Sequence, residues 1–252
     1  MTPRAARLLL RLAVLIGTAG WPSGCSLRPQ PEPPPVEPGP DIDPDLLSVV
    51  PTMPAAMHSG TIEGARGAVP AGATVRAYNL HTALPPFETT VASDGSFTLS
   101  IEMVEGDEVR LQAIVDDERS EPLDLIVGAP NTKPVLASRA LSDCLSIAPA
   151  TQLDLGSLAG GQSIVRPVVI ANGCAFEISV DRAQMRRPVE GLTVDVPTAL
   201  PFSVSAGESA SLHLRYDAPV GVDGEAEDVL LIQVDAPQRD RRPVTVFARV
   251  AP

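Results

Sequence analysis

Positive charge, aromatic side chains and long apolar runs are all scarce in this sequence. It has 19 basic residues, of which Lys133 is the only lysine, against 31 acidic ones. Nucleic-acid binding depends on lysine and arginine side chains that neutralise phosphates, so this balance argues against a nucleic-acid partner. The single lysine also removes most lysine-based catalytic mechanisms.

Histidine and cysteine are scarce too, with three of each. None of the GxSxG, SxxK, HExxH and GxxxxGK motifs is present. His58, His81 and His213 are not paired in sequence with a nucleophile or a set of metal ligands. We therefore expect no enzyme, no catalytic residue, no metal and no cofactor. A triad assembled from distant residues is the alternative that the sequence leaves open.

The chain begins with a segment typical of an export signal, which we place at residues 1–24. Arg4, Arg7 and Arg11 are its only charged side chains, and a mostly apolar run follows at 12–21. A membrane-spanning helix needs roughly twenty apolar residues, so this run is too short to be one. The segment is therefore predicted to be a cleaved signal peptide.

The segment Pro22-Ser23-Gly24-Cys25 resembles the lipobox of bacterial lipoproteins, with Pro22 in place of the usual leucine. The resemblance implies cleavage before Cys25 and lipid on its sulfur and new amino group. Ser26 follows where an aspartate would favour the inner membrane, so it also implies the outer membrane, facing the periplasm or the outside. An ordinary cleaved signal peptide is the alternative.

Without the signal peptide the chain keeps sixteen basic against 31 acidic residues, a net charge of −15. Such an acidic surface argues against electrostatic docking on anionic lipid and favours solubility. The lipid anchor at Cys25 is then the expected contact with the membrane.

Residues 25–57 are predicted to be the lipidated N-terminus followed by a proline-rich linker. Eight prolines fall in the segment 28–44, and proline favours the extended polyproline II form. Twenty such residues would span on the order of 60 Å, enough for a stiff tether. A PxxP ligand for a partner groove is the alternative.

Alternate aspartates at the end of this linker suggest the start of an EF-hand calcium loop. The rest of the motif is missing, because Leu46 stands where the turn needs glycine and Thr52 where a bidentate glutamate belongs. We therefore predict that Asp41, Asp43 and Asp45 belong to a solvated acidic linker.

Beyond residue 58, short runs rich in valine, isoleucine, leucine and threonine alternate with glycine, proline, aspartate and asparagine clusters. In 209–216, for example, Leu212, Leu214 and Tyr216 alternate with polar residues, the period of a half-buried strand. Many short strands separated by turns predict an all-β chain of two tandem immunoglobulin-like or prealbumin-like β-sandwiches. We place them at 58–130 and 137–252, with the boundary in 128–134.

The first unit resembles the carboxypeptidase-regulatory-like and Cna-B-like families. The residues that carry this likeness are the strands in 70–80, 91–101 and 106–114, with Asp94-Gly95 at a hairpin turn. The resemblance covers roughly 58–128 and implies a small prealbumin-type sandwich, which in those families often serves as a spacer on exported bacterial proteins.

The second unit resembles the Hydin-like, choice-of-anchor-D type of immunoglobulin-like domain over about 143–250. The matching positions are Leu155, Gly156, Gly161, Ser163, Asn172, Gly173, Gly207, Glu208, Ser209, Tyr216, Pro219 and Gly221. The chain departs from the family pattern at Cys174, which follows the Asn-Gly pair. The resemblance implies an all-β interaction or spacer module without catalytic residues.

Cys144 and Cys174 both lie in this second unit, 30 residues apart. In an oxidising compartment such a pair favours a disulfide, which by loop entropy would contribute roughly 3–4 kcal/mol. Two free buried thiols or a thiolate metal pair are the alternatives, and no nearby histidine supports the metal pair.

Five arginines form the basic segments of the second unit: Arg186, Arg187, Arg239, Arg241 and Arg242. We expect them to pair with local carboxylates and to guard exposed strand edges against association. A basic patch that meets an acidic partner or lipid phosphates is the alternative.

Together these features predict a non-catalytic, membrane-anchored envelope lipoprotein that acts as a binding or scaffolding module, with another envelope or surface protein as partner. The alternatives are a calcium- or carbohydrate-binding surface adhesion module, a pure spacer, or an accessory subunit of a secretion complex. The shortage of aromatic side chains counts against carbohydrate binding.

Overall fold

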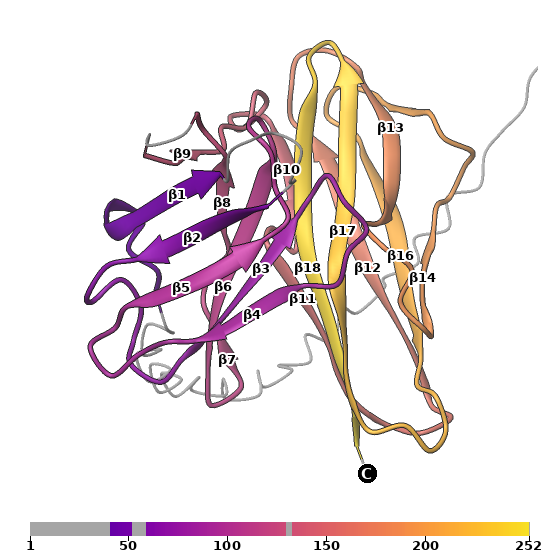
Figure 1. The fold of residues 1–252 in the computed structure, drawn as a ribbon. Helices are drawn as coiled ribbons and strands as arrows, with labels where there is room; N and C mark the ends of the chain where they lie inside the picture. Colours follow the sequence, from indigo (N-terminus) through magenta and orange to yellow (C-terminus); the bar gives the residue numbers. More distant parts are fainter. Residues whose placement is uncertain (1–40, 52–58, 130–132, 252) are drawn as a thin grey trace, which may run out of the picture. The chain divides into compact units, whose positions relative to one another are not determined.

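Strands form nearly all the regular structure of this chain. The computed structural model describes residues 41–51, 59–129 and 133–251, which contain eighteen strands and one short 3-10 helix, η1 (Pro44–Leu46) (Figure 1). The predicted all-β fold class is confirmed. Within the described ranges no helix has the length and apolar character needed to cross a membrane. Cys25 lies outside the described residues, so its lipidation stays a prediction.

The first sandwich consists of a three-stranded and a six-stranded sheet. The three-stranded sheet has the order β1 (Leu47–Pro51), β2 (Gly60–Gly64), β5 (Phe97–Ile101). The six-stranded sheet has the order β4 (Phe87–Thr90), β3 (Thr74–Asn79), β6 (Glu108–Val115), β8 (Leu123–Ile126), β9 (Val135–Leu136), and β7 (Glu118–Arg119) also pairs with β6. All these pairs are antiparallel.

Alternating side chains of β5 show how the first core forms. Phe97, Leu99 and Ile101 point into the core, whereas Thr98 and Ser100 are exposed. The turn before β5 depends on Gly95, which has a φ of +82°. A Cβ atom there would lie 2.8 Å from the backbone of Gly67, so both the conformation and the space require glycine.

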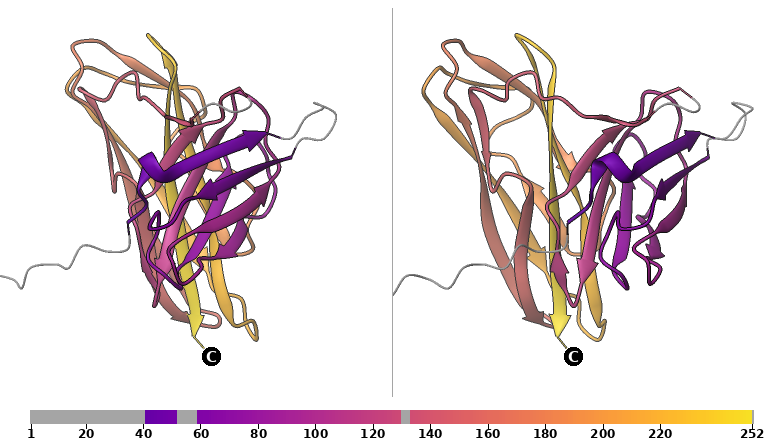
Figure 2. Two further views of the ribbon diagram at one scale, coloured as in Figure 1. Left: turned by 60° about the vertical axis from the view of Figure 1, so that its left-hand side comes forward. Right: turned by 90° about the vertical axis from the view of Figure 1, so that its left-hand side faces the viewer.

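The predicted linker 25–57 is too long at its C-terminal end. Its segment Leu47–Pro51 is strand β1, which pairs with β2 in full register (Figures 1 and 2). Ile42, Leu47 and Val49 are buried in the first core. The physical reason is that Leu47 and Val49 alternate with Ser48 and Val50 after the proline-rich run, so this segment can complete a sheet. The remaining domain boundaries stay predictions.

The second sandwich consists of a four-stranded and a five-stranded sheet. The four-stranded sheet has the order β10 (Leu145–Ala148), β12 (Ser163–Asn172), β16 (Ser209–Asp217), β14 (Leu192–Asp195). The five-stranded sheet has the order β11 (Gln152–Ala159), β18 (Asp240–Ala251), β17 (Gly224–Ala236), β13 (Ile178–Met185), β15 (Phe202–Val204). Only the pair of β11 with β18 is parallel among the pairs of these two sheets.

Strand β16 follows the predicted alternation. Leu212, Leu214 and Tyr216 are almost fully buried, whereas His213 and Arg215 are exposed. This strand supplies part of an apolar core that both sheets of the second sandwich enclose. A disulfide between Cys144 and Cys174, with Cα atoms 4.7 Å apart, joins the start of β10 to the turn after β12, as predicted.

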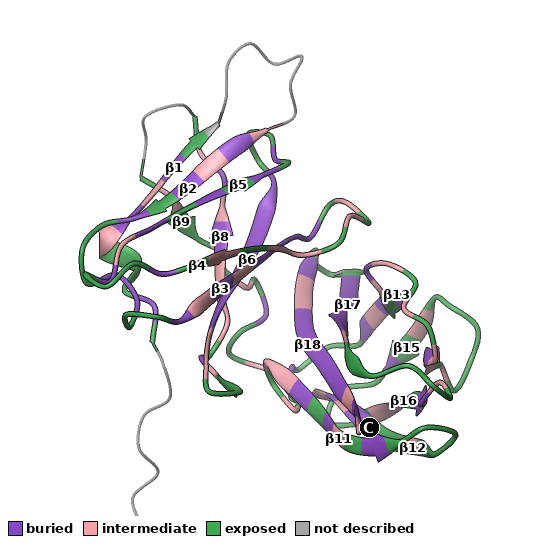
Figure 3. Cartoon of the chain, turned by 60° about the horizontal axis from the view of Figure 1, so that its bottom comes forward, coloured by how far each residue is buried: buried purple, intermediate pink, exposed green. Residues whose placement is uncertain are grey.

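Strands β6, β17 and β18 are buried on both faces over much of their length (Figure 3). One face of each contributes to its own sandwich core. The other face meets side chains of the other sandwich, within the one compact unit that spans Pro38–Pro252. This contact between the two sandwiches is largely polar.

Candidate functional site

Charged and polar side chains from both sandwiches bond to one another between the six-stranded and the five-stranded sheet. We call this region the polar joint. Its members in the first sandwich are Arg76, His81, Glu108, Arg110, Gln112, Arg119 and Asp124, and in the second they are Arg186, Glu225, Glu227, Asp228, Arg241 and Thr245. Burial of a charged group is costly unless the group is paired, so the stability of this region depends on the partner of each charge.

Arg186 makes the most complete set of contacts in the polar joint. It follows β13, and its guanidinium donates from Nε and Nη2 to the two carboxylate oxygens of Asp228 at 2.8 and 2.9 Å. Its Nη1 donates to the backbone carbonyls of Thr82 and Leu84 at 2.8 and 2.6 Å. The side chains of Arg186 and Asp228 are 1% and 0% exposed, so these bonds replace water on both groups.

The guanidinium of Arg186 also lies over the ring of Tyr78, 5.5 Å from its centroid. Burial lowers the pKa of Arg186, and Asp228 opposes that change. Burial likewise raises the pKa of Asp228, against the pull of Arg186 and Arg187. Each charge thus depends on its partner, and either one alone would be an unpaired charge in a nearly dry site.

A second ionic cluster joins β17 to β3 and β7. Arg119 donates to Glu225 and Glu227 at 2.6 Å each, and Arg76 bonds to both of these glutamates as well. Arg119 also lies 4.2 Å from the centroid of the Phe247 ring on β18, a cation–π contact. Because Glu225 and Glu227 are two residues apart on one strand, they present their carboxylates on the same face.

A third set of contacts begins at Arg110 on β6, whose side chain is 2% exposed. It forms a bidentate pair with Asp124, at 2.7 and 2.9 Å, within the first sandwich. Its Nη1 then reaches the second sandwich and donates to the carbonyl of Thr151 at 3.0 Å and to Thr245 Oγ1 at 3.2 Å. Burial acts to raise the pKa of Asp124, but Arg110 and Arg139 outweigh it, so this pKa lies below its ordinary value.

Only a small apolar cluster accompanies these charges. It consists of Tyr78 and Leu80 from the first sandwich and Val229 and Leu231 from β17. These four side chains are at most 5% exposed. The polar joint therefore resembles the core of neither sandwich, where aliphatic side chains dominate.

The five arginines singled out in the sequence all pair with carboxylates. Arg186 and Arg187 pair with Asp228, Arg239 with Asp235, Arg241 with Glu108, and Arg242 with Asp240. The predicted pairing with local carboxylates is confirmed except for Arg241, whose partner Glu108 lies in the other sandwich. The prediction that they guard strand edges is wrong for Arg186, because its guanidinium is buried against backbone carbonyls of the other sandwich.

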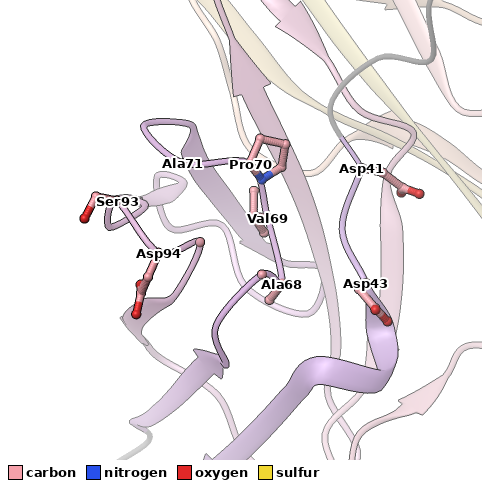
Figure 4. A pocket seen from close by; sticks show the side chains of 10 residues that line it. Asp41, Asp43, Ala68, Val69, Pro70, Ala71, Ser93 and Asp94 are labelled. Atoms are coloured by element: carbon pink, nitrogen blue, oxygen red, sulfur yellow. The ribbon is translucent and has the colours of Figure 1, made fainter.

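Two of the three aspartates at the end of the linker, Asp41 and Asp43, line a hollow of about 500 Å³ together with Asp94 (Figure 4). Asp41 accepts a bond from the Ile42 amide, and Asp43 accepts one from the Asp45 amide. Asp94 bonds to Ser96 and pairs with Arg66. Each carboxylate therefore serves a local turn. Within the described ranges, no three His, Cys, Asp or Glu side chains are placed to hold a metal ion.

Comparisons with known proteins give no family for the chain: no family model and no curated protein matches it. Similar solved structures include a protein of unknown function from Porphyromonas gingivalis W83, with 15% identity, 81% of this chain and 100% of that chain covered, and a TM-score of 0.34. Another is the PapD-like domain 7 of human CEP192, with 6% identity, 46% and 90% coverage, and a TM-score of 0.33.

The Vibrio cholerae VesB protease is also similar, at 12% identity, with 73% of this chain and 64% of that chain covered and a TM-score of 0.36. All these scores and identities are low, so none carries an argument about activity. The all-β sandwich architecture rests on the strands described above.

The polar joint could not be found from strand alternation alone. Glu108, Arg110 and Gln112 alternate with apolar residues in β6, which predicts a solvated face, yet all three are at most 5% exposed. One signal was present in β17, where Val229, Leu230, Leu231 and Ile232 form a continuous apolar run. Such a run is typical of a strand that is buried on both faces.

Proposed function

We propose that this protein is a non-catalytic, lipid-anchored lipoprotein of the cell envelope, in which two β-sandwiches form a binding or scaffolding module. The Hydin-like and carboxypeptidase-regulatory-like resemblances support the finer assignment of the two sandwiches. The anchor is Cys25, and the proline-rich segment after it is the tether. The partner is another envelope or surface protein.

The observation that carries the proposal is the polar joint. A rotated or shifted arrangement of the two sandwiches would separate Glu227 from Arg119, and Arg186 Nη1 from the carbonyls of Thr82 and Leu84; an ionic group left buried without its partner costs several kcal/mol. The paired arrangement is therefore selected over other docked arrangements. A tethered module with one fixed arrangement can present its surfaces and strand edges to a partner in a constant geometry, as scaffolding requires.

Mass spectrometry of the mature N-terminus tests the anchor. We expect a chain that begins at Cys25 and carries a diacyl or triacyl mass, and we expect Cys25→Ser to lose that mass and to leave the membrane fraction. The double variant Cys144→Ser with Cys174→Ser is the matched control, because it removes two cysteines and should keep the lipid. A wild-type chain recovered without acyl groups would overturn the proposal.

Crosslinking from the anchored protein tests the binding role. We expect a specific envelope protein to be captured by the wild-type chain and lost when the ion pairs across the polar joint are removed by Glu225→Ala combined with Glu227→Ala. If the lipidated protein captures no partner, a role as a pure spacer replaces the binding role.

A further inference from the structure

His81 lies at the edge of the polar joint, in the segment 80–86 that connects β3 to β4. Its Nε2 is 2.8 Å from Nη1 of Arg241 on β18. Its Nδ1 faces Asp107 Oδ1 at 3.7 Å. The imidazole thus connects a loop of the first sandwich to the C-terminal strand of the second.

These contacts define the protonation state of the ring. An arginine only donates hydrogen bonds, so His81 Nε2 must accept from Arg241 and cannot carry a proton in this arrangement. The remaining ring proton is then on Nδ1, the atom that faces Asp107. The Arg241 contact is therefore specific to the neutral imidazole.

The charged groups around the ring act in opposite directions. Burial lowers the pKa of His81, Arg241 lowers it further, and Asp107 and Glu108 raise it, with the pKa below its ordinary value as the result. Glu108 does not belong to His81 alone, because Arg139 approaches it at 2.6 Å and Arg241 at 3.4 Å. A protonated His81 would therefore lie next to the positive charge of Arg241. Glu108 would offset this repulsion only in part, because it also pairs with Arg139 and Arg241.

We propose that His81 makes the polar joint acid-sensitive: protonation of Nε2 breaks its bond to Arg241 and loosens segment 80–86 from β18. The arginine has room to move, since a cavity of about 390 Å³ is lined by His81, Glu108, Arg139 and Arg241. Arg186 still holds the same segment through the carbonyls of Thr82 and Leu84. The expected change is thus a local loosening at one side of the joint.

Proton linkage determines whether a lower pH favours the closed or the loosened joint. The closed joint prefers neutral His81, and the loosened joint restores the imidazole to its ordinary pKa of 6.5. Protons therefore favour the loosened form as the pH falls below 6.5, and the effect levels off below the lowered pKa. Each pKa unit between the two forms corresponds to about a tenfold change in the opening equilibrium.

A histidine NMR titration of the full chain, combined with amide exchange, tests this inference. The chain has three histidines, so their ring signals can be assigned by substitution. We expect His81 to titrate below 6.5, and Arg241→Met to raise its pKa, because Asp107 and Glu108 then remain without the opposing charge. We also expect amide protection in 79–84, corrected for intrinsic exchange, to fall between about pH 7.5 and pH 5.

Two variants complete the test. His81→Gln keeps an acceptor for Arg241 and removes the titration, so its protection should not depend on pH. His213→Gln is the matched control, because His213 is exposed on β16 and its loss should leave the pH response intact. A wild-type His81 that titrates at or above 6.5, or an equal loss of protection in His81→Gln, would overturn the inference. Neither readout depends on lipid at Cys25, so failure here leaves the proposed anchoring untouched.

Discussion

The two sandwich cores and most of the polar joint are buried, but they are built from opposite kinds of side chain. The cores consist of aliphatic residues such as Ile62 and Leu214, whose burial is favourable in almost any close-packed arrangement. The joint consists of guanidinium and carboxylate groups such as Arg186 and Asp228, whose burial is tolerable only when they meet in the right geometry.

The cores and the polar joint therefore contribute differently to the free energy of folding and to the relative placement of the two sandwiches. Apolar burial supplies most of the free energy of folding, and it discriminates weakly among similar packings. Buried ion pairs add little net stability, because their mutual attraction is offset by desolvation. The pairs that cross between the sandwiches, such as Arg119 with Glu227, nevertheless disfavour arrangements that separate them. We therefore assign the cores to stability and the joint to the relative placement of the two sandwiches.

The largest expected effect comes from breaking the joint at Asp228. Asp228→Ala leaves the guanidinium of Arg186 buried without a carboxylate, which should lower the free energy of unfolding by about 3–5 kcal/mol. Urea unfolding followed by circular dichroism measures this loss. Asp217→Ala is the control, because Arg215 and Asp217 form an exposed pair and the urea midpoint should hardly move. Equal losses of stability in the two variants would contradict the distinction between the buried and the exposed ion pair.

Removal of the disulfide should have the next largest effect, and it acts on the second core. The double variant Cys144→Ala with Cys174→Ala opens a loop of 30 residues, which should cost about 3–4 kcal/mol by chain entropy. Thermal unfolding monitors the loss. If the contacts of Arg186 are unchanged in this variant, core stability and joint geometry are separable. A disulfide-free chain of unaltered melting temperature would contradict the prediction.

Replacing both members of the Arg186–Asp228 pair tests whether the pair contributes net stability. Asp228→Leu combined with Arg186→Met removes the buried pair and fills its space with apolar atoms, so most of the stability lost in Asp228→Ala should return. The arrangement should nevertheless become less well defined, because the bonds from Arg186 to the carbonyls of Thr82 and Leu84 are lost as well. A double variant as unstable as Asp228→Ala would show that the pair itself contributes net stability.

The smallest effect concerns pH. The pKa of His81 is lowered by burial and by Arg241, so stability should be constant above 6.5, fall slightly as the pH drops below 6.5, and then level off. Urea midpoints at several pH values measure this change, and the curve of His81→Gln should lack it. A rise in stability toward acid pH would reverse the expected sign.

The cores and the joint also differ in how far the sequence predicts them. The alternation in β5 and β16 is a local pattern, and it correctly identifies which side chains face the core. The partners in the joint lie far apart in the chain: Arg110 meets Thr245, and Arg119 meets Glu227. No local period specifies such pairs, so the alternation in β6 does not reveal that its polar side chains are buried.

The start of the first sandwich illustrates the same limit. Proline content marks the predicted linker well up to Pro44, but Leu47–Pro51 is too short a run to be recognised as a strand by itself. Its place depends on pairing with β2, which supplies the backbone hydrogen bonds and buries Val49. Edge strands of this kind are fixed by their neighbours more than by their own sequence.

Residual dipolar couplings of the backbone amides test the central claim most directly, namely that the polar joint fixes one arrangement of the two sandwiches. If it does, the couplings of residues 59–129 and 137–251 will fit a single alignment tensor in the wild-type chain. In the double variant Glu225→Ala with Glu227→Ala, which removes the carboxylates that Arg76 and Arg119 meet across the joint, the two ranges will need separate tensors. Two tensors of different magnitude in the wild-type protein would contradict the claim, because the sandwiches would then reorient independently.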